Sequence, residues 1–202
     1  MKLYYSPAAC SLSPHIALLE AGLPFELVKV DLKTHRLADG TDYHSINGKG
    51  SVPMLELDDG QRLSEGPAIV QYIADRNPAS GLAPAAGTME RYRLKELLNF
   101  ISTELHKSFS PLFDATVPAE YKETVRKRLG QRFDWLTAQL QGRDYLTGSQ
   151  STVADGYLFT VLNWCQWVGI DLARWPVLAA YAARVAARPA TRDAMAAEGL
   201  LQ

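Results

Sequence analysis

The chain has 202 residues, with 21 basic and 22 acidic side chains that leave a formal net charge of −1. This balance lacks the positive charge of a nucleic-acid-binding protein, so we expect no nucleic-acid partner. The 47% of hydrophobic residues exclude a disordered chain. No apolar run reaches the roughly 18 residues that a membrane span needs, and the N-terminus lacks the apolar core of a signal peptide. We therefore expect a cytoplasmic protein that has no membrane partner.

Strand and helix patterns alternate in the first third of the chain. Ser13 followed by Pro14 suits the N-cap and the first residue of a helix, and Ser64 is placed to cap another. Two strand-like runs flank Asp58-Asp59-Gly60, a turn sequence typical of an antiparallel hairpin. The predicted strands cover residues 2–5, 25–30, 54–57 and 61–63, and the predicted helices begin at residues 13 and 64.

A linker pattern separates this region from the rest. Residues 77–88, NPASGLAPAAGT, contain no charge and are rich in proline, glycine and alanine. Beyond them apolar residues recur every three or four positions, which predicts helices over residues 94–112, 121–140, 152–168 and 176–188. We therefore predict a small α/β domain over residues 1–80, followed by an all-helical domain over residues 88–202.

The two cysteines have different surroundings in the sequence. Cys10 lies between the first strand and the first helix, in a C-x-x-S pattern, where a helix N-terminus favours a thiolate. A free cysteine is also often an inert buried residue, so this pattern alone leaves both interpretations open. Cys165 lies inside an apolar helical run, and we assign it to the core.

Two backbone features could hold a peptide-like ligand. If the bond before Pro53 is cis, the backbone groups of Val52 face outward and can pair with an extended peptide, but only about 5–6% of such bonds are cis. The start of the helix after Glu65 offers backbone N–H groups to a carboxylate, and Glu65 itself can pair with an ammonium group. An amino-acid head carries both charges. The alternatives are a trans proline and an ordinary helix N-terminus.

A polar stripe runs along the first helix after the linker. Asn99, Thr103, His106 and Ser110 fall within an arc of about 60° at the 100° per residue of an α-helix. A solvated face gives the same pattern. The basic residues between 122 and 132 are accompanied by acidic ones, and we interpret them as another solvated face. The four histidines and two cysteines lack metal-ligand spacing, so we expect no metal.

A capping signal begins the helix after residue 151. Thr152 is placed at the N-cap and Asp155 three residues later, a capping box with aspartate in place of the usual glutamate or glutamine. We interpret this pair as structural, with a cap worth about 1 kcal/mol.

Four segments together resemble one protein family: MKLYYSPAACSLSPHIAL, KGSVP, SEGPAI and NFISTELHK, in that order. The chain resembles the glutathione transferases, specifically the bacterial beta class, over essentially its whole length. The resemblance implies a thioredoxin-like domain that binds glutathione, followed by an all-helical domain that supplies the acceptor-substrate pocket. It also implies a homodimer whose substrates are small hydrophobic electrophiles.

The resemblance assigns roles to particular residues. Cys10 is placed beside the glutathione sulfur and can form a mixed disulfide with it, and Val52 holds the cysteinyl backbone through a cis bond to Pro53. Glu65 and Gly66 hold the γ-glutamyl head. The residues implied to line the site from the helical domain are Asn99, Thr103, Glu104, Leu105 and His106, with Glu104 reaching the glutathione of the neighbouring subunit.

Three positions depart from the family pattern. His35 stands where relatives commonly carry a lysine facing the glycyl carboxylate, so we expect weaker glutathione binding above pH 7, where imidazole is neutral. Gly48 replaces a proline, which should loosen the loop before Val52. Pro67 replaces a valine or serine in the first turn of a helix, where proline is tolerated.

The implied activity is a detoxifying conjugation in which the glutathione thiolate attacks an electrophilic carbon. We expect the thiolate to be stabilised by the helix N-terminus, by Cys10 with Ser11, and by His106. Cys10 could instead act directly through a mixed disulfide. The alternatives are a glutathione-dependent thiol oxidoreductase or reductive dehalogenase on the same fold, and a non-catalytic carrier of hydrophobic ligands.

Overall fold

The computed structural model describes residues 1–201 and divides into two compact units. The first unit comprises residues 1–83 together with the segment from Arg188 onwards, and the second comprises residues 84–187. The predicted second domain, 88–202, thus extends past the end of the second unit, because the last helix packs against the first helix of the chain. Among the described helices, none combines the length and apolar character needed to cross a membrane.

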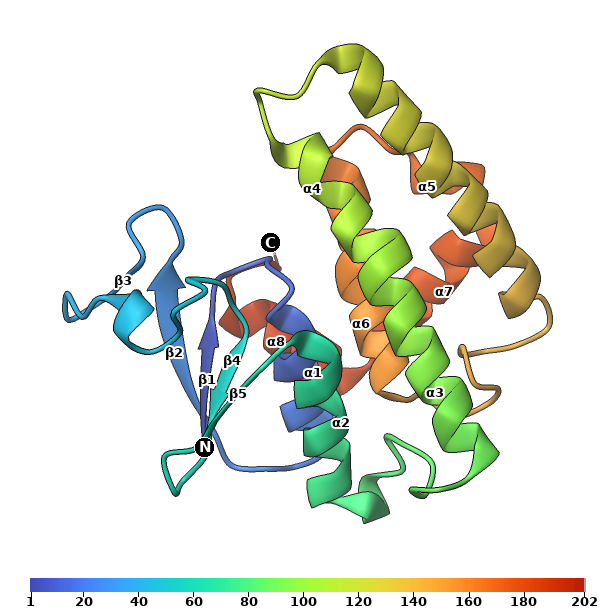
Figure 1. The fold of residues 1–202 in the computed structure, drawn as a ribbon. Coiled ribbons are helices and arrows are strands. Elements are labelled where there is room, and N and C mark those ends of the chain that lie inside the picture. The colour runs from blue at the N-terminus through green and yellow to red at the C-terminus, as the bar shows by residue number, and fades with distance from the viewer. Residues whose placement is uncertain (202) are drawn as a thin grey trace. The chain divides into compact units, whose positions relative to one another are not determined.

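The first unit is built on a five-stranded mixed sheet (Figure 1). Its strands are β1 (Lys2–Tyr5), β2 (Glu26–Asp31), β3 (Arg36–Leu37), β4 (Met54–Glu56) and β5 (Arg62–Ser64), in the order β3-β2-β1-β4-β5. Strands β1 and β2 are parallel, with Lys2 opposite Glu26, and the other neighbouring pairs are antiparallel. Apart from the two-residue β3, which was not predicted, the element order is β-α-β followed by β-β-α, and it confirms the predicted thioredoxin-like fold.

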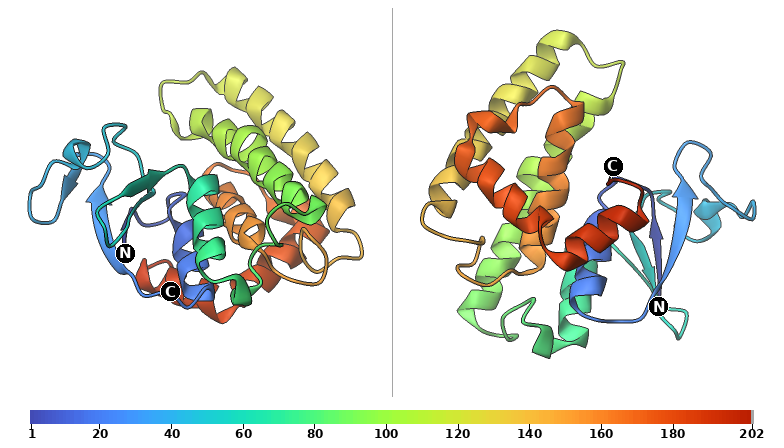
Figure 2. Two further views of the ribbon diagram at one scale, coloured as in Figure 1. Left: turned by 60° about the horizontal axis from the view of Figure 1, so that its bottom comes forward. Right: turned by 180° about the vertical axis from the view of Figure 1, so that it is seen from behind.

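Both faces of the sheet are covered. Helices α1 (Leu12–Glu20) and α2 (Gly66–Arg76) lie on one face (Figures 1 and 2). Side chains alternate along a strand, so the ring of Tyr5 lies 6.3 Å from His15 of α1, whereas Tyr4 packs at 5.7 Å against Tyr43 on the other face. Side chains of β1 therefore pack on both faces of the sheet. This packing holds the end of β1, where the loop to α1 begins, in place.

Helix α1 begins earlier than the predicted Ser13 cap. Its first residue is Leu12 and its N-cap is Ser11, so Ser13 lies inside the first turn. The Ser13 hydroxyl is buried and has no hydrogen-bond partner among residues 1–201. The Ser13-Pro14 pair marks the helix start correctly to within two residues, because proline is tolerated anywhere in the first turn.

The last helix, α8 (Pro189–Ala197), is tied to α1 and to the loop before it. Glu198 contacts His15 Nδ1 at 2.9 Å through one carboxylate oxygen and accepts the N–H of Ala8 at 3.1 Å through the other. Arg188 donates to Glu20 at 2.6 and 2.8 Å. Figure 2 shows α8 beside α1. A buried carboxylate from the C-terminal segment therefore braces the loop that carries Cys10.

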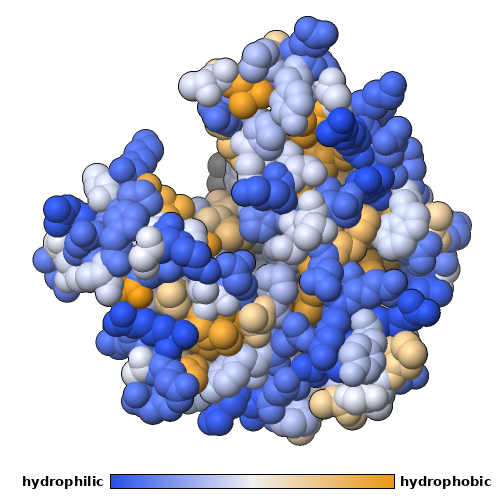
Figure 3. Space-filling view, in the orientation of Figure 1, coloured by the Kyte–Doolittle hydropathy of each residue, from blue (hydrophilic) through white to orange (hydrophobic). Residues whose placement is uncertain are grey.

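The second unit is helical, as predicted. It contains α3 (Met89–Phe100), a π-helical turn (Ile101–His106), α4 (Lys107–Phe113), α5 (Ala119–Leu140), α6 (Val153–Leu162) and α7 (Pro176–Ala186). All ten residues of α6 are buried, which makes it the central helix. Helix α6 ends six residues before the predicted end at 168, and a 3₁₀ turn, Asn163–Trp167, follows it. In the view of Figure 3, hydrophobic residues reach the surface only as patches among hydrophilic ones.

The predicted capping box at the start of α6 is confirmed, and it is more extensive than expected. The Asp155 carboxylate is fully buried and accepts four hydrogen bonds. One oxygen accepts from the Leu146 N–H at 2.9 Å and the Tyr181 hydroxyl at 2.8 Å. The other accepts from the N–H and hydroxyl of Thr152, at 2.8 and 3.0 Å. Asp155 thus links α6 to α7 and to the loop before α6.

Candidate active site

The loop between β1 and α1 brings Cys10 to the turn before β4. The Val52–Pro53 peptide bond is cis, so the cis alternative is confirmed over the commoner trans one. The Cys10 thiol donates a hydrogen bond to the Val52 carbonyl oxygen, with 3.2 Å between Sγ and O. Two residues 42 positions apart in sequence, both predicted site residues, therefore meet at the edge of β4.

The Cys10 thiol is protonated at neutral pH. Burial raises its pKa to about 12, and the negative charge of Glu65 acts in the same direction. The backbone N–H groups of Cys10 and Ser11 lower the pKa, but by less than burial raises it. Of the two interpretations that the sequence left open, the raised pKa favours a protonated thiol over a thiolate, because loss of solvation outweighs the effect of the helix N-terminus.

Ser11 stabilises the loop from within. Its side chain is fully buried. The Ser11 hydroxyl donates to the Ser6 carbonyl oxygen at 3.2 Å and accepts from the Ser6 N–H at 3.1 Å. The Ser11 hydroxyl thus forms two hydrogen bonds with the backbone of Ser6, one as donor and one as acceptor. These bonds fix the path of the loop around Cys10.

Glu65 occupies a special position at the start of α2. It is the N-cap residue with φ = 71°, and its carboxylate makes no capping hydrogen bond. Its side chain is 72% exposed and pairs with Lys49, whose ammonium lies 2.5 Å from the carboxylate. Lys49 also donates to the Ser64 hydroxyl at 2.8 Å. Ser64 itself ends β5 and does not cap α2 as predicted, whereas Gly66 is the first helical residue.

Lys49 is a site residue that the sequence reasoning missed. It belongs to the KGSVP segment, which the sequence analysis used for the family resemblance without assigning a role to its lysine. Opposite charge is the signal that could have revealed it. Lys49 lies in the turn before Pro53, and Glu65, its partner in an exposed ion pair, lies at the N-terminus of α2. An ammonium group of a ligand could take the place of Lys49 beside the Glu65 carboxylate.

The segment before the cis proline is shaped by two histidines. His35 has a positive φ of 52°, and its Nδ1–H donates to the Gly50 carbonyl oxygen at 3.1 Å, because a carbonyl can only accept. Its ring packs against that of His44, with 4.5 Å between ring centroids. A Cβ on Gly50 would lie 2.5 Å from His44 Cε1 and 3.0 Å from His35 Nδ1. Gly50 itself has φ = 65°, a conformation that favours glycine, and a Cβ there would also displace the His44 ring.

Replacing Gly50 with alanine is expected to lower the free energy of unfolding by about 2–3 kcal/mol, because it adds both left-handed strain and a clash. Gly48→Ala is the matched control, since Gly48 has no neighbouring atom within 4 Å and no positive φ. We expect Gly48→Ala to change the stability by less than about 1 kcal/mol, or to increase it. Urea unfolding of the two variants measures the difference, and equal stabilities would contradict this account of Gly50.

Four of the five predicted site residues of the second unit fall on the π-helical turn, whereas Asn99 lies in α3. Such turns wind fewer degrees per residue than an α-helix, so the arc of about 60° calculated for the polar stripe does not hold. The exposed Thr103 donates its hydroxyl to the Asn99 carbonyl oxygen at 3.0 Å. Glu104 accepts two hydrogen bonds of 2.8 Å from Arg132 of α5. Leu105 is fully buried in the core of the unit, so its side chain offers no surface to a ligand, against the prediction.

His106 is held by aromatic neighbours. Its Nδ1 lies 2.7 Å from the Tyr157 hydroxyl, and its ring meets that of Trp164 edge-on with centroids 4.9 Å apart. The side chain is half-buried, and α6 orients it through Tyr157. Within residues 1–201, no three histidine, cysteine or acidic side chains come together as a metal site.

Comparisons with known proteins match both units. Family models of the glutathione S-transferase N-terminal domain and C-terminal domain match residues 8–76 and 100–189. Glutathione S-transferase GstA of Escherichia coli O157:H7 is 48% identical over 200 residues, which cover 99% of this chain and 100% of that protein.

Solved structures extend this likeness to the fold. A sphingomonad glutathione S-transferase complexed with glutathione has a TM-score of 0.96 at 49% identity, and the match covers 100% of both chains. A bacterial beta-class glutathione S-transferase from Sphingomonas chungbukensis also has a TM-score of 0.96, at 46% identity over 100% of both chains. Because family models and relatives together span the whole sequence, this chain belongs to the glutathione S-transferase family, as its resemblance to the bacterial beta class predicted.

Proposed function

We propose that this enzyme conjugates glutathione, its co-substrate, to small hydrophobic electrophiles through attack of the glutathione thiolate on carbon. The observation that carries the proposal is the meeting of the Cys10 thiol with the Val52 carbonyl oxygen at the cis proline. A thiol, an extended backbone segment and the exposed Glu65 carboxylate lie in one unit, and they complement the thiol, peptide backbone and amino-acid head of glutathione. The glutathione complex of a 49% identical relative supports the same ligand.

Each part of the tripeptide has a proposed partner. The γ-glutamyl ammonium replaces Lys49 at Glu65, and the adjoining carboxylate binds the backbone N–H groups that begin α2 at Gly66. The cysteinyl backbone pairs with Val52 next to Pro53. His35 faces the glycyl carboxylate with Nε2, since Gly50 already engages its Nδ1. The weaker binding above pH 7 that His35 implies stays a prediction.

The neutral Cys10 thiol suits a hydrogen-bond donor better than a nucleophile. When glutathione binds, the thiol can turn its proton from the Val52 oxygen to the glutathione sulfur and stabilise the thiolate there. Ser11 acts as a positioning residue, because its hydroxyl holds the loop at Ser6. A pKa of about 12 disfavours the mixed-disulfide chemistry of an oxidoreductase or dehalogenase.

The second unit is proposed to supply the acceptor pocket and the remaining contacts. Asn99, Thr103 and His106 are the polar groups proposed to line it, with Tyr157 positioning His106. We propose a cytoplasmic homodimer with a detoxifying role. In it Glu104 exchanges one of its Arg132 hydrogen bonds for the glutathione of the partner subunit. A non-catalytic carrier would show no glutathione-dependent turnover of an electrophile.

Turnover of 1-chloro-2,4-dinitrobenzene with glutathione, followed by absorbance, tests the proposal. We expect saturation in glutathione, and Glu65→Ala is expected to raise the KM for glutathione about tenfold or more because a charge-assisted hydrogen bond is lost. The matched control is Glu26→Ala, which removes an exposed glutamate of β2 in the same unit. Absence of turnover contradicts conjugation, and an unchanged KM in Glu65→Ala contradicts the assignment of the γ-glutamyl head.

A further inference from the structure

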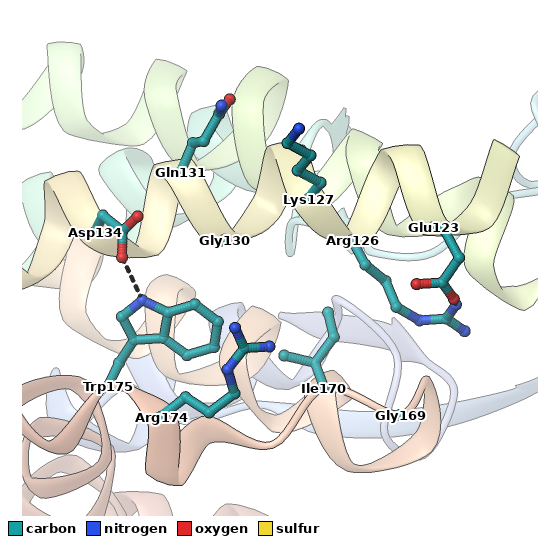
Figure 4. Close-up of a pocket in the computed structure, with 10 residues that line it drawn as sticks. All are labelled: Glu123, Arg126, Lys127, Gly130, Gln131, Asp134, Gly169, Ile170, Arg174 and Trp175. Carbon is teal, nitrogen blue, oxygen red and sulfur yellow. Dashed lines mark hydrogen bonds and ion pairs between the residues drawn. The ribbon is translucent and has the colours of Figure 1, made fainter. Parts of the chain in front are cut away.

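Trp175 lines a groove between α5 and residues 169–175, but other residues of the second unit already cover its ring. Trp175 is 8% exposed, and Figure 4 shows its indole N–H directed at Asp134, to which it donates at 2.7 Å. Its ring meets that of Phe133 edge-on with 5.2 Å between centroids, and the Arg174 guanidinium lies 5.1 Å from the ring centroid. These contacts join α5 to the segment before α7, and we assign them to the packing of the second unit.

His35 in the first unit differs, because one of its ring nitrogens has no partner. Its Nδ1–H donates to the Gly50 carbonyl oxygen at 3.1 Å, whereas Nε2 forms no hydrogen bond within residues 1–201. The half-buried ring packs against His44 with 4.5 Å between centroids, and the His35 carbonyl oxygen accepts the Tyr43 N–H at 2.8 Å. Contacts with two segments therefore fix the ring, and Nε2 is the atom left for a ligand.

The contact with Gly50 decides which role Nε2 can play. A carbonyl oxygen only accepts, so Nδ1 carries a proton in the neutral ring as well as in the charged one. A neutral imidazole has a single N–H, and its other nitrogen is an acceptor. Nε2 of neutral His35 can therefore accept a hydrogen bond but cannot donate one, and it becomes a donor when the ring is an imidazolium.

His35 is within reach of the C-terminal end of the proposed tripeptide. Gly50 lies two residues before Val52, which corresponds to about 7 Å of extended chain. A peptide whose cysteinyl backbone pairs with Val52, and whose chain continues toward Gly50, therefore brings its next residue to His35. This step rests on the proposed function, in which that residue is the glycine of glutathione.

The charged groups around His35 come from three segments. The Asp42 carboxylate, which caps the 3₁₀ turn Tyr43–Ser45, accepts the His44 N–H at 3.0 Å. The Lys49 ammonium, in the segment before the cis proline, is paired with Glu65. The segment of His35 itself adds Lys33 and Arg36, of which Arg36 donates to the Gly40 carbonyl oxygen at 2.7 Å.

We propose that the protonation of His35 selects between two classes of thiol tripeptide. The imidazolium donates from Nε2 to the glycyl carboxylate of glutathione, and a site that was neutral takes up one proton from solvent for this hydrogen bond. Neutral His35 presents a lone pair instead, which meets a carboxylate as acceptor against acceptor but accepts the N–H of a C-terminal amide. The enzyme therefore also takes amidated glutathione, in which the glycyl carboxylate is joined to ammonia or an amine, as its co-substrate.

Calorimetric titration with two S-hexylated peptides tests the proposal: S-hexylglutathione, and its analogue in which glycinamide replaces glycine. The hexyl group blocks the thiol, and both peptides share the γ-glutamyl and cysteinyl residues, so the ratio of their affinities reports the subsite at His35. At pH 5.5 we expect the carboxylate to bind about tenfold or more tightly than the amide, because its hydrogen bond is charge-assisted. At pH 8.5 we expect the amide to bind at least as tightly as the carboxylate.

Proton uptake provides a second measurement. Repeating both titrations at pH 7.5 in phosphate and in Tris, two buffers with different ionisation enthalpies, counts the protons that bind with each peptide. We expect S-hexylglutathione to take up more protons than its glycinamide analogue, because only the carboxylate requires the imidazolium. Any proton bound by the shared part of the two peptides cancels in this difference.

Two variants identify the group that titrates. His35→Lys carries a donor at both pH values, and we expect it to prefer the carboxylate about tenfold at pH 5.5 and at pH 8.5. His44→Phe is the matched control, because phenylalanine keeps an aromatic ring beside His35 but binds no proton. We expect His44→Phe to retain the change of preference with pH.

The outcomes separate this inference from the proposed function. Binding of both peptides with the same ratio at pH 5.5 and pH 8.5 would overturn the inference and leave the proposed function standing, with a permanent cation such as Lys49 holding the carboxylate. Loss of the pH dependence in His44→Phe, or its persistence in His35→Lys, would overturn the assignment to His35. Absence of binding by either peptide would contradict the proposed function and this inference together.

Discussion

Replacing Asp155 with alanine is expected to lower the free energy of unfolding by about 3–5 kcal/mol, the range for removing one member of a buried charged network. The carboxylate is fully buried and accepts hydrogen bonds from Thr152, Leu146 and Tyr181. Alanine leaves these donors unpaired away from water, and it also removes the N3 carboxylate of the capping box of the central helix α6. Equilibrium unfolding in urea, followed by circular dichroism, measures the loss.

The matched control is Asp144→Ala. Asp144 is 62% exposed and pairs with Arg184 at 3.5 Å, so we expect a loss below about 1 kcal/mol. If Asp155→Ala does not fold, Tyr181→Phe still tests the network, because it removes a single donor at an expected cost of about 1 kcal/mol. Equal stabilities of Asp155→Ala and Asp144→Ala would show that the buried network contributes nothing beyond a surface ion pair.

The effect of Asp155 is also expected to depend on pH. Burial raises the pKa of this carboxyl above its ordinary value, although the hydrogen bonds from its partners lower it in part. The folded protein thus binds the proton more tightly than the unfolded chain, so this contribution to stability is largest at low pH and is lost as the pH rises through the folded-state pKa. The stability difference between the natural protein and Asp155→Ala should accordingly become smaller as the pH rises through the folded-state pKa, which urea unfolding at a series of pH values measures.

The parts of this molecule that follow from local pattern could be predicted from the sequence. The capping box and the helices after the linker are set by residues close together in the chain, and the structure confirms them. The order of strands and helices in the first unit likewise follows from turn residues and apolar spacing. The cis bond at Pro53 could not be separated from a trans bond by pattern, because local sequence favours trans and only the surrounding fold selects the rarer form.

Features that depend on contacts between residues far apart in the chain could not be predicted from the sequence. Glycine is favoured at position 50 by its left-handed backbone and by the rings of His35 and His44 beside it, and no local pattern reports that contact. Helix α8 belongs with the first unit because the buried Glu198 meets His15, 183 residues earlier in the chain. The π-helical turn in the first helix after the linker also changed which residues of the polar stripe share a face.

The Cys10 thiol illustrates the same limit for chemistry. A helix N-terminus is visible in the sequence and favours a thiolate, whereas the burial that opposes it depends on the whole first unit. Burial is the larger effect, so position in a motif was insufficient to predict the protonation state. The consequence is an expected reactivity opposite to that of a redox-active cysteine.

Alkylation of Cys10 by iodoacetamide at pH 8 is expected to be on the order of 50-fold slower than that of free cysteine. With a pKa of about 12, only about one thiol in 10,000 is ionised at pH 8, against roughly a quarter for a pKa near 8.5. The greater nucleophilicity of a high-pKa thiolate recovers only part of this difference. The measurement is the rate of mass increase of a Cys165→Ser variant, in which Cys10 is the remaining cysteine.

The pH profile and two substitutions decide between the roles open to Cys10. If burial controls the thiol, the alkylation rate rises about tenfold per pH unit through pH 10, whereas a plateau near pH 7–8 would establish a thiolate and restore the mixed-disulfide route. A hydrogen-bond donor can be replaced by another hydroxyl or thiol but not by a methyl group. Cys10→Ser is therefore expected to keep most of the conjugation rate, and Cys10→Ala to lose about tenfold in kcat. Equal loss in both variants would mean that the sulfur itself reacts, because serine retains the donor and lacks only the nucleophile that a mixed disulfide requires.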